Sequence, residues 1–190
     1  MIGLVVLLAV IVALIVYLAG IYNGLVGLRE NIKVSWANID VLLKQRHDEL
    51  PKLIETCKRY MQFEQDTLEK VMRARASVSQ ASASGNVAAV GAAEQQLRVG
   101  MTRLFAVAEN YPQLKSDETF KQLQARITAL EESIADRREL YNDQVNLNNI
   151  RVNVFPDVLI ARRLGFLPAH LLEFAGEEKS DVDVGSLFRA

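Results

Sequence analysis

The chain opens on an unbroken run of apolar residues. Positions 2–22 read IGLVVLLAVIVALIVYLAGIY and carry no charge, and the first charged side chain is Arg29. About 20 apolar helical residues, rising about 1.5 Å each, cross a hydrocarbon layer of about 30 Å. Lipid offers no partner to an open backbone N–H or C=O, so such a run must be helical. It therefore predicts an N-terminal transmembrane helix.

A cleaved secretory signal peptide is the alternative interpretation of this run. Signal peptides have a basic n-region and an apolar core of about 7 to 15 residues. Here Met1 alone precedes the run, and the apolar core is longer. We therefore expect an uncleaved anchor. Because Lys and Arg favour the cytoplasmic side, Arg29 and Lys33 predict an outside N-terminus and a cytoplasmic domain.

After the run, apolar positions recur at helical spacings of three, four or seven residues. They are Leu28, Ile32, Trp36, Ile39, Leu43, Leu50, Ile54, Cys57, Met61, Leu68 and Val71. Pro51 interrupts this stripe, but the stripe continues in phase beyond it. A single kinked helix that reaches about Arg75 is therefore favoured over two separate helices, and Pro51 deprives the carbonyl of His47 of its usual partner.

Two more long helices are expected. The small and polar residues 77–91 predict a turn, and Asn86 is the expected N-cap of a second helix that ends before Pro112. A third helix is expected to begin with Ser116 as its N-cap. Its heptad positions predict a packing seam of coiled-coil type that turns polar after Leu130. The seam comprises Phe120, Ile127, Ile134, Tyr141, Asn148 and Phe155, with Leu123 and Leu130 as companions.

No sustained alternation of apolar and polar residues predicts a strand, so the fold class is all-α. We expect an antiparallel bundle of three main helices plus a short C-terminal helix capped by Gly165, continuous with the transmembrane helix. The predicted divisions are an anchor at 1–24, a bundle at 25–165 and a tail at 166–190. The apolar tail residues, among them Phe166 and Phe174, either fold back on their own domain or pack on a neighbouring chain.

Composition narrows the possible functions. The 190 residues include 22 Lys plus Arg and 23 Asp plus Glu, a balance that argues against a globally basic nucleic-acid binder. Cys57 is the one cysteine and lies on the apolar stripe, where it is expected to pack as a small hydrophobe. The two histidines, His47 and His170, are too far apart for an H-E-x-x-H zinc motif. We expect no enzymatic activity and no cofactor.

Two charged groups stand out. Residues 46–49, beside Pro51, form either a metal or proton site, or a solvated turn whose charges pair with each other or with the third helix; the solvated turn is favoured. Arginines late in the chain suit acidic lipid headgroups or an acidic partner, although a solvated face is the commoner outcome. These arginines are Arg137, Arg138, Arg151, Arg162 and Arg163.

Several blocks, in this order, resemble the bacterial LemA family. They are YNGLV at 22–26, WANIDVLLKQRHD at 36–48, LFAVAENYPQLK at 104–115, YN at 141–142, NN at 148–149, FP at 155–156 and GF at 165–166. The resemblance covers nearly the whole chain. It implies a membrane-anchored helical bundle with no assigned enzymatic activity and no agreed catalytic residues. The resemblance also implies frequent encoding beside a membrane zinc protease of the HtpX type, and a relative among magnetosome-membrane proteins.

We predict an inner-membrane scaffold that acts through homo-oligomerisation and through helix-mediated contacts with other membrane proteins and lipids. The alternative, an adaptor or regulator of an HtpX-type protease, rests on the resemblance alone. Core packing is the expected role of Trp36, rather than anchoring at the membrane interface. The residues expected to serve the anchor and its interactions are Tyr22, Gly24, Trp36, Arg46, His47, Phe155, Phe166 and Phe174.

Overall fold

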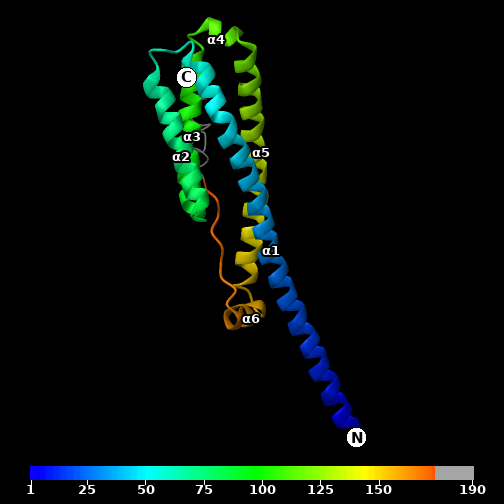
Figure 1. Ribbon diagram of the computed structural model, residues 1–190. Coiled ribbons are helices and arrows are strands. Elements are labelled where there is room, and N and C mark those ends of the chain that lie inside the picture. The colour runs from blue at the N-terminus through cyan, green and yellow to red at the C-terminus, as the bar shows by residue number, and fades with distance from the viewer. Residues whose placement is uncertain (174–190) are drawn as a thin grey trace, which may run out of the picture. The chain divides into compact units, whose positions relative to one another are not determined.

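The computed structural model describes residues 1–173, and within them the chain forms six α-helices and no strand (Figure 1). The predicted all-α fold class is confirmed. Phe174, one of the predicted interaction residues, lies outside the described residues. The helices are α1 Ile2–Lys58, α2 Gln65–Ala83, α3 Val87–Ala108, α4 Pro112–Ser116, α5 Glu118–Arg151 and α6 Asp157–Leu164.

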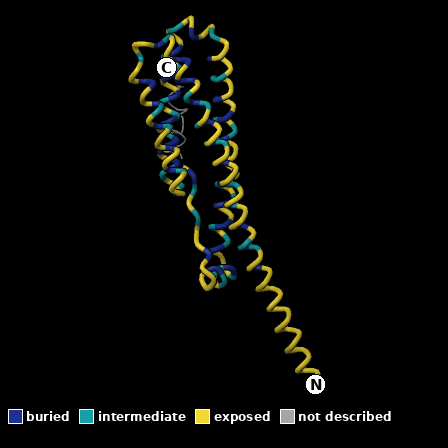
Figure 2. Tube along the Cα trace, in the orientation of Figure 1, coloured by how far each residue is buried: buried dark blue, intermediate teal, exposed yellow. Residues whose placement is uncertain are grey.

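Helix α1 contains both the apolar run and Pro51. It is the one helix among residues 1–173 that is long and apolar enough to cross a membrane, with a window of mean hydropathy 3.2 that buries none of its residues. Figure 2 shows this N-terminal part of α1 exposed along its length. The prediction that one helix continues past Pro51 is confirmed. The carbonyl that the proline frees, at His47, accepts a hydrogen bond from Nε of Arg75 in α2 at 2.8 Å.

The prediction that this helix reaches about Arg75 is wrong, because α1 ends at Lys58 and the chain reverses before α2 begins at Gln65. The apolar stripe stays in phase across the break because residues on both sides of it are buried. Met61 in the turn and Leu68 and Val71 in α2 are all nearly inaccessible to solvent. A helical spacing of apolar residues marks a buried face, and it does not by itself show that the helix is continuous.

Helices α2 and α3 form a hairpin with a much shorter turn than the predicted 77–91 (Figure 1). Gly85 adopts a φ of 66°, a left-handed conformation that glycine reaches without steric cost. The predicted N-cap is confirmed, since the Asn86 side chain accepts a hydrogen bond from the backbone N–H of Ala89 at 3.1 Å. Small residues that suggested a loop instead lie buried within the two helices, for example Ala81 in α2 and Gly91 in α3.

Helix α5 begins one residue later than predicted, with Asp117 in place of Ser116 as its cap. The Asp117 carboxylate accepts from the backbone N–H of Phe120 at 3.0 Å and from the Tyr60 hydroxyl at 2.9 Å. These two bonds lower the pKa of Asp117. Ser116 instead donates its hydroxyl to the carbonyl of Pro112 at 2.6 Å, at the end of the short helix α4. This helix was not predicted from the sequence.

The described chain divides into two compact units. Unit 1 comprises Met1–Val41 and Ile134–Leu171, and unit 2 comprises Leu42–Ser133 together with Leu172 and Glu173. In unit 1, a small core forms where α6 meets α1 and the end of α5; its buried members are Ile21, Leu25, Val152, Ala161 and Phe166. Gly165 ends α6 with a φ of 73°, the predicted C-cap. In unit 2, the α2–α3 hairpin packs with the end of α1 and the start of α5.

Candidate functional site

The most deeply buried charge among the described residues is Arg46, on the unit 2 part of α1. Its side chain is 1% exposed, and its guanidinium donates from Nη2 to Glu94 on α3 and from Nη1 to Glu131 on α5. Glu94 is 3% exposed and Glu131 is 27% exposed. The planar fork of arginine suits two carboxylates at once. One side chain thus joins three helices of unit 2.

The charges of this cluster do not balance when all three groups are ionised, because two carboxylates face one guanidinium. Burial and the competing charge of Glu131 raise the pKa of Glu94, although Arg46 opposes the shift. Burial works to lower the pKa of Arg46, but the two carboxylates outweigh it and raise that pKa. A protonated Glu94 leaves a neutral cluster of Arg46 with Glu131, so the cluster has one carboxyl group that favours holding a proton.

The structure corrects the favoured interpretation of residues 46–49 as a solvated turn. Arg46 is buried, although it does pair with the helix that follows Asp117, as that interpretation also allowed. Asp48 is exposed, and Glu49 pairs with Lys52 at 3.0 Å. His47 is partly buried; burial lowers its pKa, and the nearby Arg75 lowers it further. Within residues 1–173 no group of three or more His, Cys, Asp or Glu side chains is placed to hold a metal ion.

Sequence reasoning missed Glu94, although the sequence carries a signal for it. Val90, Leu97 and Met101 form the inward face of α3, and Glu94 lies at helical spacing between them. A carboxylate on an apolar face must find a partner when it is buried. Periodicity alone therefore marks Glu94 as a paired or protonated group. It does not show that the partner is Arg46, because that requires α1 and α3 to lie side by side.

Three predicted interaction residues meet where α1 leaves its apolar run, in unit 1. The Tyr22 and Phe166 rings pack edge to face with centroids 6.0 Å apart, and the guanidinium of Arg29 lies 5.3 Å from the Phe166 centroid. A Cβ on Gly24 would lie 3.1 Å from Nη2 of Arg151, so glycine makes room for that guanidinium. Their role in anchoring stays a prediction.

The other predicted residues of unit 1 have different surroundings. Trp36 packs on Tyr141 with ring centroids 5.6 Å apart, and the Tyr141 hydroxyl donates to the carbonyl of His170 at 3.0 Å. Phe155 is 79% exposed. Cys57, in unit 2, is buried as expected, and burial raises the pKa of its thiol to about 12.

Two asparagines near the end of α5, Asn148 of the predicted heptad seam and its neighbour Asn149, bind the segment that follows α6. The Asn148 side chain donates to the carbonyl of Leu167 at 3.2 Å, and the Asn149 side chain both donates to the carbonyl of Ala169 and accepts from its N–H, at 2.9 and 2.8 Å. The segment after α6 is thereby held along α5. Phe166 and Leu172 are buried, so this part of the chain folds back on its own protomer.

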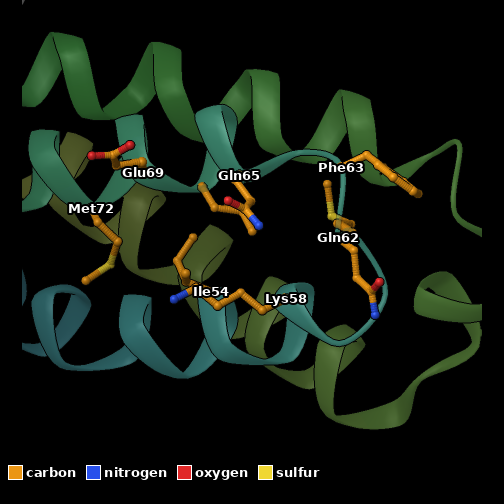
Figure 3. A pocket seen from close by; sticks show the side chains of 9 residues that line it. Ile54, Lys58, Gln62, Phe63, Gln65, Glu69 and Met72 are labelled. Atoms are coloured by element: carbon orange, nitrogen blue, oxygen red, sulfur yellow. The ribbon is translucent and has the colours of Figure 1, made fainter.

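An open pocket of about 750 Å³ lies where α1 ends and α2 begins, in unit 2 (Figure 3). Phe63, at its rim, is 94% exposed. The lining contains no serine, cysteine or histidine. The lining residues are Ile54, Lys58, Met61, Gln62, Phe63, Gln65, Leu68, Glu69 and Met72.

Comparison with known proteins places these features in a family. Residues 35–185 match the model of the LemA family. The chain is 24% identical to Magnetosome protein MamQ 1 and to MamQ 2 of Paramagnetospirillum magneticum strain AMB-1, over 86% of this chain and 68% of each relative. It is 22% identical to Magnetosome protein MamQ of Magnetospirillum gryphiswaldense strain MSR-1, over 82% of this chain and 66% of the relative. The apolar helix and these magnetosome relatives point to membrane anchoring. The match over most of its length shows that this chain belongs to the LemA family.

Proposed function

We propose that this protein is a structural scaffold of the bacterial inner membrane that assembles with copies of itself through α5 of unit 1. The observation that carries the proposal is a row of exposed apolar side chains at the end of α5. Leu140, Leu147 and Ile150 are each about half exposed and are separated by seven and three residues. That spacing places them on one side of the helix, as in a helix–helix seam.

Exposed apolar side chains that recur on one side of a helix commonly mark an interaction site. A second copy is the occupant that the row fits best, because copies anchored in one membrane are already confined to a shared plane and orientation. Two such rows can form a symmetric contact in which each chain offers the same surface. The names of the family and of the relatives carry no enzymatic activity, and none is part of this proposal.

The mass of the full-length protein in mild detergent, measured by light scattering, tests the proposal. We expect a dimer or larger assembly for the natural chain, and a monomer for Leu147→Glu with Ile150→Glu, because two carboxylates facing each other across the seam repel. The matched control is Phe63→Glu with Val99→Glu, which adds the same charge at exposed apolar positions of unit 2 and should keep the assembly. A natural chain that is monomeric at all working concentrations would contradict the proposal.

We further propose that the N-terminus lies outside and that the chain after the apolar run lies in the cytoplasm. Arg29 and Lys33 follow the apolar run closely, and basic residues beside a span favour the cytoplasmic side. An adaptor role for a membrane zinc protease stays a prediction from the family resemblance, since no contact described above favours it.

A further inference from the structure

Helix α6 lies against the point where α1 leaves its apolar run (Figure 1). Ala161 of α6 and Phe166, just after it, share a buried core with Ile21 and Leu25 of α1. The apolar run ends at Tyr22, whose ring packs on Phe166. If the run spans a bilayer, its end lies at the border between hydrocarbon and headgroups. Helix α6 is therefore held at the height of the membrane surface.

The side of α6 that faces away from this core is both apolar and basic. Asp157 and Ala161 are buried, whereas Leu159 is 61% exposed and both Arg162 and Arg163 are exposed. Further exposed apolar residues flank the helix. We call the exposed surface of the helix and its two flanks the α6 face; it comprises Phe155, Leu159 and Leu167, which are 79, 61 and 76% exposed, together with Arg162 and Arg163.

No acidic side chain opposes these arginines in the surrounding sequence. Between residues 144 and 172 the chain has a single acidic residue, Asp157, which is buried and bound by Arg151. The α6 face is therefore positively charged as well as apolar. Large apolar side chains beside arginines are the combination found in helices that lie in the headgroup layer, where anionic lipids attract the basic groups. Arginine stems can also cover apolar surface while their charged ends reach phosphate.

We propose that the α6 face is a second membrane contact, in which Phe155, Leu159 and Leu167 enter the headgroup layer and Arg162 and Arg163 bind anionic lipid headgroups. The inference rests on the proposed membrane anchoring. A bilayer fits better than a soluble protein partner, because the core around Phe166 fixes the face beside the span and the nearest surface to it is lipid. The contact would hold unit 1 at the membrane surface.

Tryptophan fluorescence in vesicles tests the apolar half of this proposal. The reporter is Phe155→Trp in a Trp36→Phe background, in the full-length chain, with vesicles of phosphatidylcholine and phosphatidylglycerol whose acyl chains are brominated close to the headgroup. We expect bromine to quench the reporter by about twofold, as for a side chain at the headgroup boundary. The natural chain is the internal control, since Trp36 lies about 20 Å of helix beyond Tyr22 and should not be quenched. If bromine quenches the reporter no more than it quenches Trp36, the lipid contact is overturned and the α6 face is left to a protein partner.

Flotation of the same vesicles separates this result from a failure of the anchor. Protein that floats with the vesicles but shows an unquenched reporter overturns the α6 contact alone. Protein that fails to float, and shows no quenching, overturns the membrane anchoring and the α6 contact together. Circular dichroism of each variant in detergent confirms that the helical content is kept.

The basic half is tested by removing charge and by changing the lipid. We expect stronger quenching with about 30% phosphatidylglycerol than with phosphatidylcholine alone, and a weaker difference in high salt. Arg162→Gln with Arg163→Gln should abolish this difference. Arg126→Gln with Arg137→Gln removes the same charge from exposed positions of α5 and should leave it intact. If quenching is equal in the two lipid compositions, or if the two double variants change it equally, the binding of anionic headgroups by Arg162 and Arg163 is overturned.

Discussion

At the scale of single residues, Arg46 is the side chain whose removal should cost most. Arg46→Met leaves Glu94 and Glu131 without the guanidinium that bonds to both, and breaking a buried pair by removing one partner costs about 3–5 kcal/mol. We expect the free energy of unfolding to fall by that amount, measured by urea denaturation followed by circular dichroism in detergent. Arg73→Met is the control, because Arg73 and Glu69 form an exposed pair, and it should change little.

A second change separates the missing charge from the missing side chain. Arg46→Met combined with Glu94→Leu removes the buried carboxylate as well as the guanidinium. It should recover much of the lost stability, because the apolar replacement leaves no buried carboxyl group without a partner at position 94. Equal losses in Arg46→Met and Arg73→Met would show that the cluster does not join the three helices as described.

Glu94 should also make stability depend on pH. Its pKa is raised in the folded chain, so the folded state holds this proton more tightly than the unfolded state does. The associated stability is fully present below the ordinary pKa of 4.5 and is lost as pH rises through the raised value. Glu94→Gln stays neutral, so its free energy of unfolding should fall less than that of the natural chain between pH 4.5 and 7. Parallel curves for the two proteins would show that Glu94 ionises normally.

The sequence predicts some of these residue details and not others. The unpaired carbonyl of His47 follows directly from Pro51, because proline has no N–H to donate. Its partner Arg75 could not be predicted, since that bond forms only when α2 folds back beside α1. The same holds for Arg46, whose two carboxylates lie on helices that are distant in sequence. Local rules identify a group that needs a partner, and tertiary structure supplies the partner.

At the scale of elements, capping chemistry and glycine geometry were more informative than apolar periodicity. Asn86 and Gly165 were predicted correctly because each satisfies a local requirement of one helix end. The end of α1 was missed because the buried stripe continues into α2 across the turn. The cap of α5 was misplaced by one residue because Ser116 and Asp117 are both good caps, and only Asp117 lies within reach of Tyr60.

Gly91 of α3 gives a prediction at this scale. A Cβ there would lie 2.2 Å from the carbonyl oxygen of Glu173, so the chain at Leu172 and Glu173 has to move away. We expect Gly91→Ala to lower the free energy of unfolding by about 1–3 kcal/mol, as overpacked sites do. The matched control is Gly27→Ala in α1, where nothing lies within 4 Å of the added methyl group. It should be neutral or stabilising by up to about 1 kcal/mol, because alanine is the better helix former.

Both variants can be compared by urea denaturation of the full-length protein in one detergent. A Gly91→Ala chain as stable as the Gly27→Ala chain would show that the segment at Leu172 does not pack against α3. No pattern in the sequence indicates this contact, since a single glycine within a helix does not show what approaches it. Gly91 is needed because the backbone of Glu173 approaches α3 closely at this position.

At the scale of the whole molecule, the proposed membrane functions gather in one of the two units. Unit 1 contains the apolar run, the α6 face and the exposed row on α5, whereas unit 2 contains the Arg46 cluster and the α2–α3 hairpin. Both units contain part of α1 and part of α5. The all-α class and the anchor were predictable from apolar patterns along the chain. The division into two units was not, because it depends on which distant segments contact each other.

The orientation of the chain in the membrane gives the last prediction. With the N-terminus outside, green fluorescent protein fused after Ala190 should fluoresce, and alkaline phosphatase fused there should be inactive, because the former folds in the cytoplasm and the latter outside it. Ile2→Lys with Gly3→Lys adds basic residues at the other end of the span and should shift part of the population to the opposite orientation, since such residues favour the cytoplasmic side. Phe63→Lys with Val99→Lys adds the same charge at exposed positions of unit 2 and should not. Active phosphatase on the natural chain would reverse the assignment and place the chain after the apolar run outside the cytoplasm.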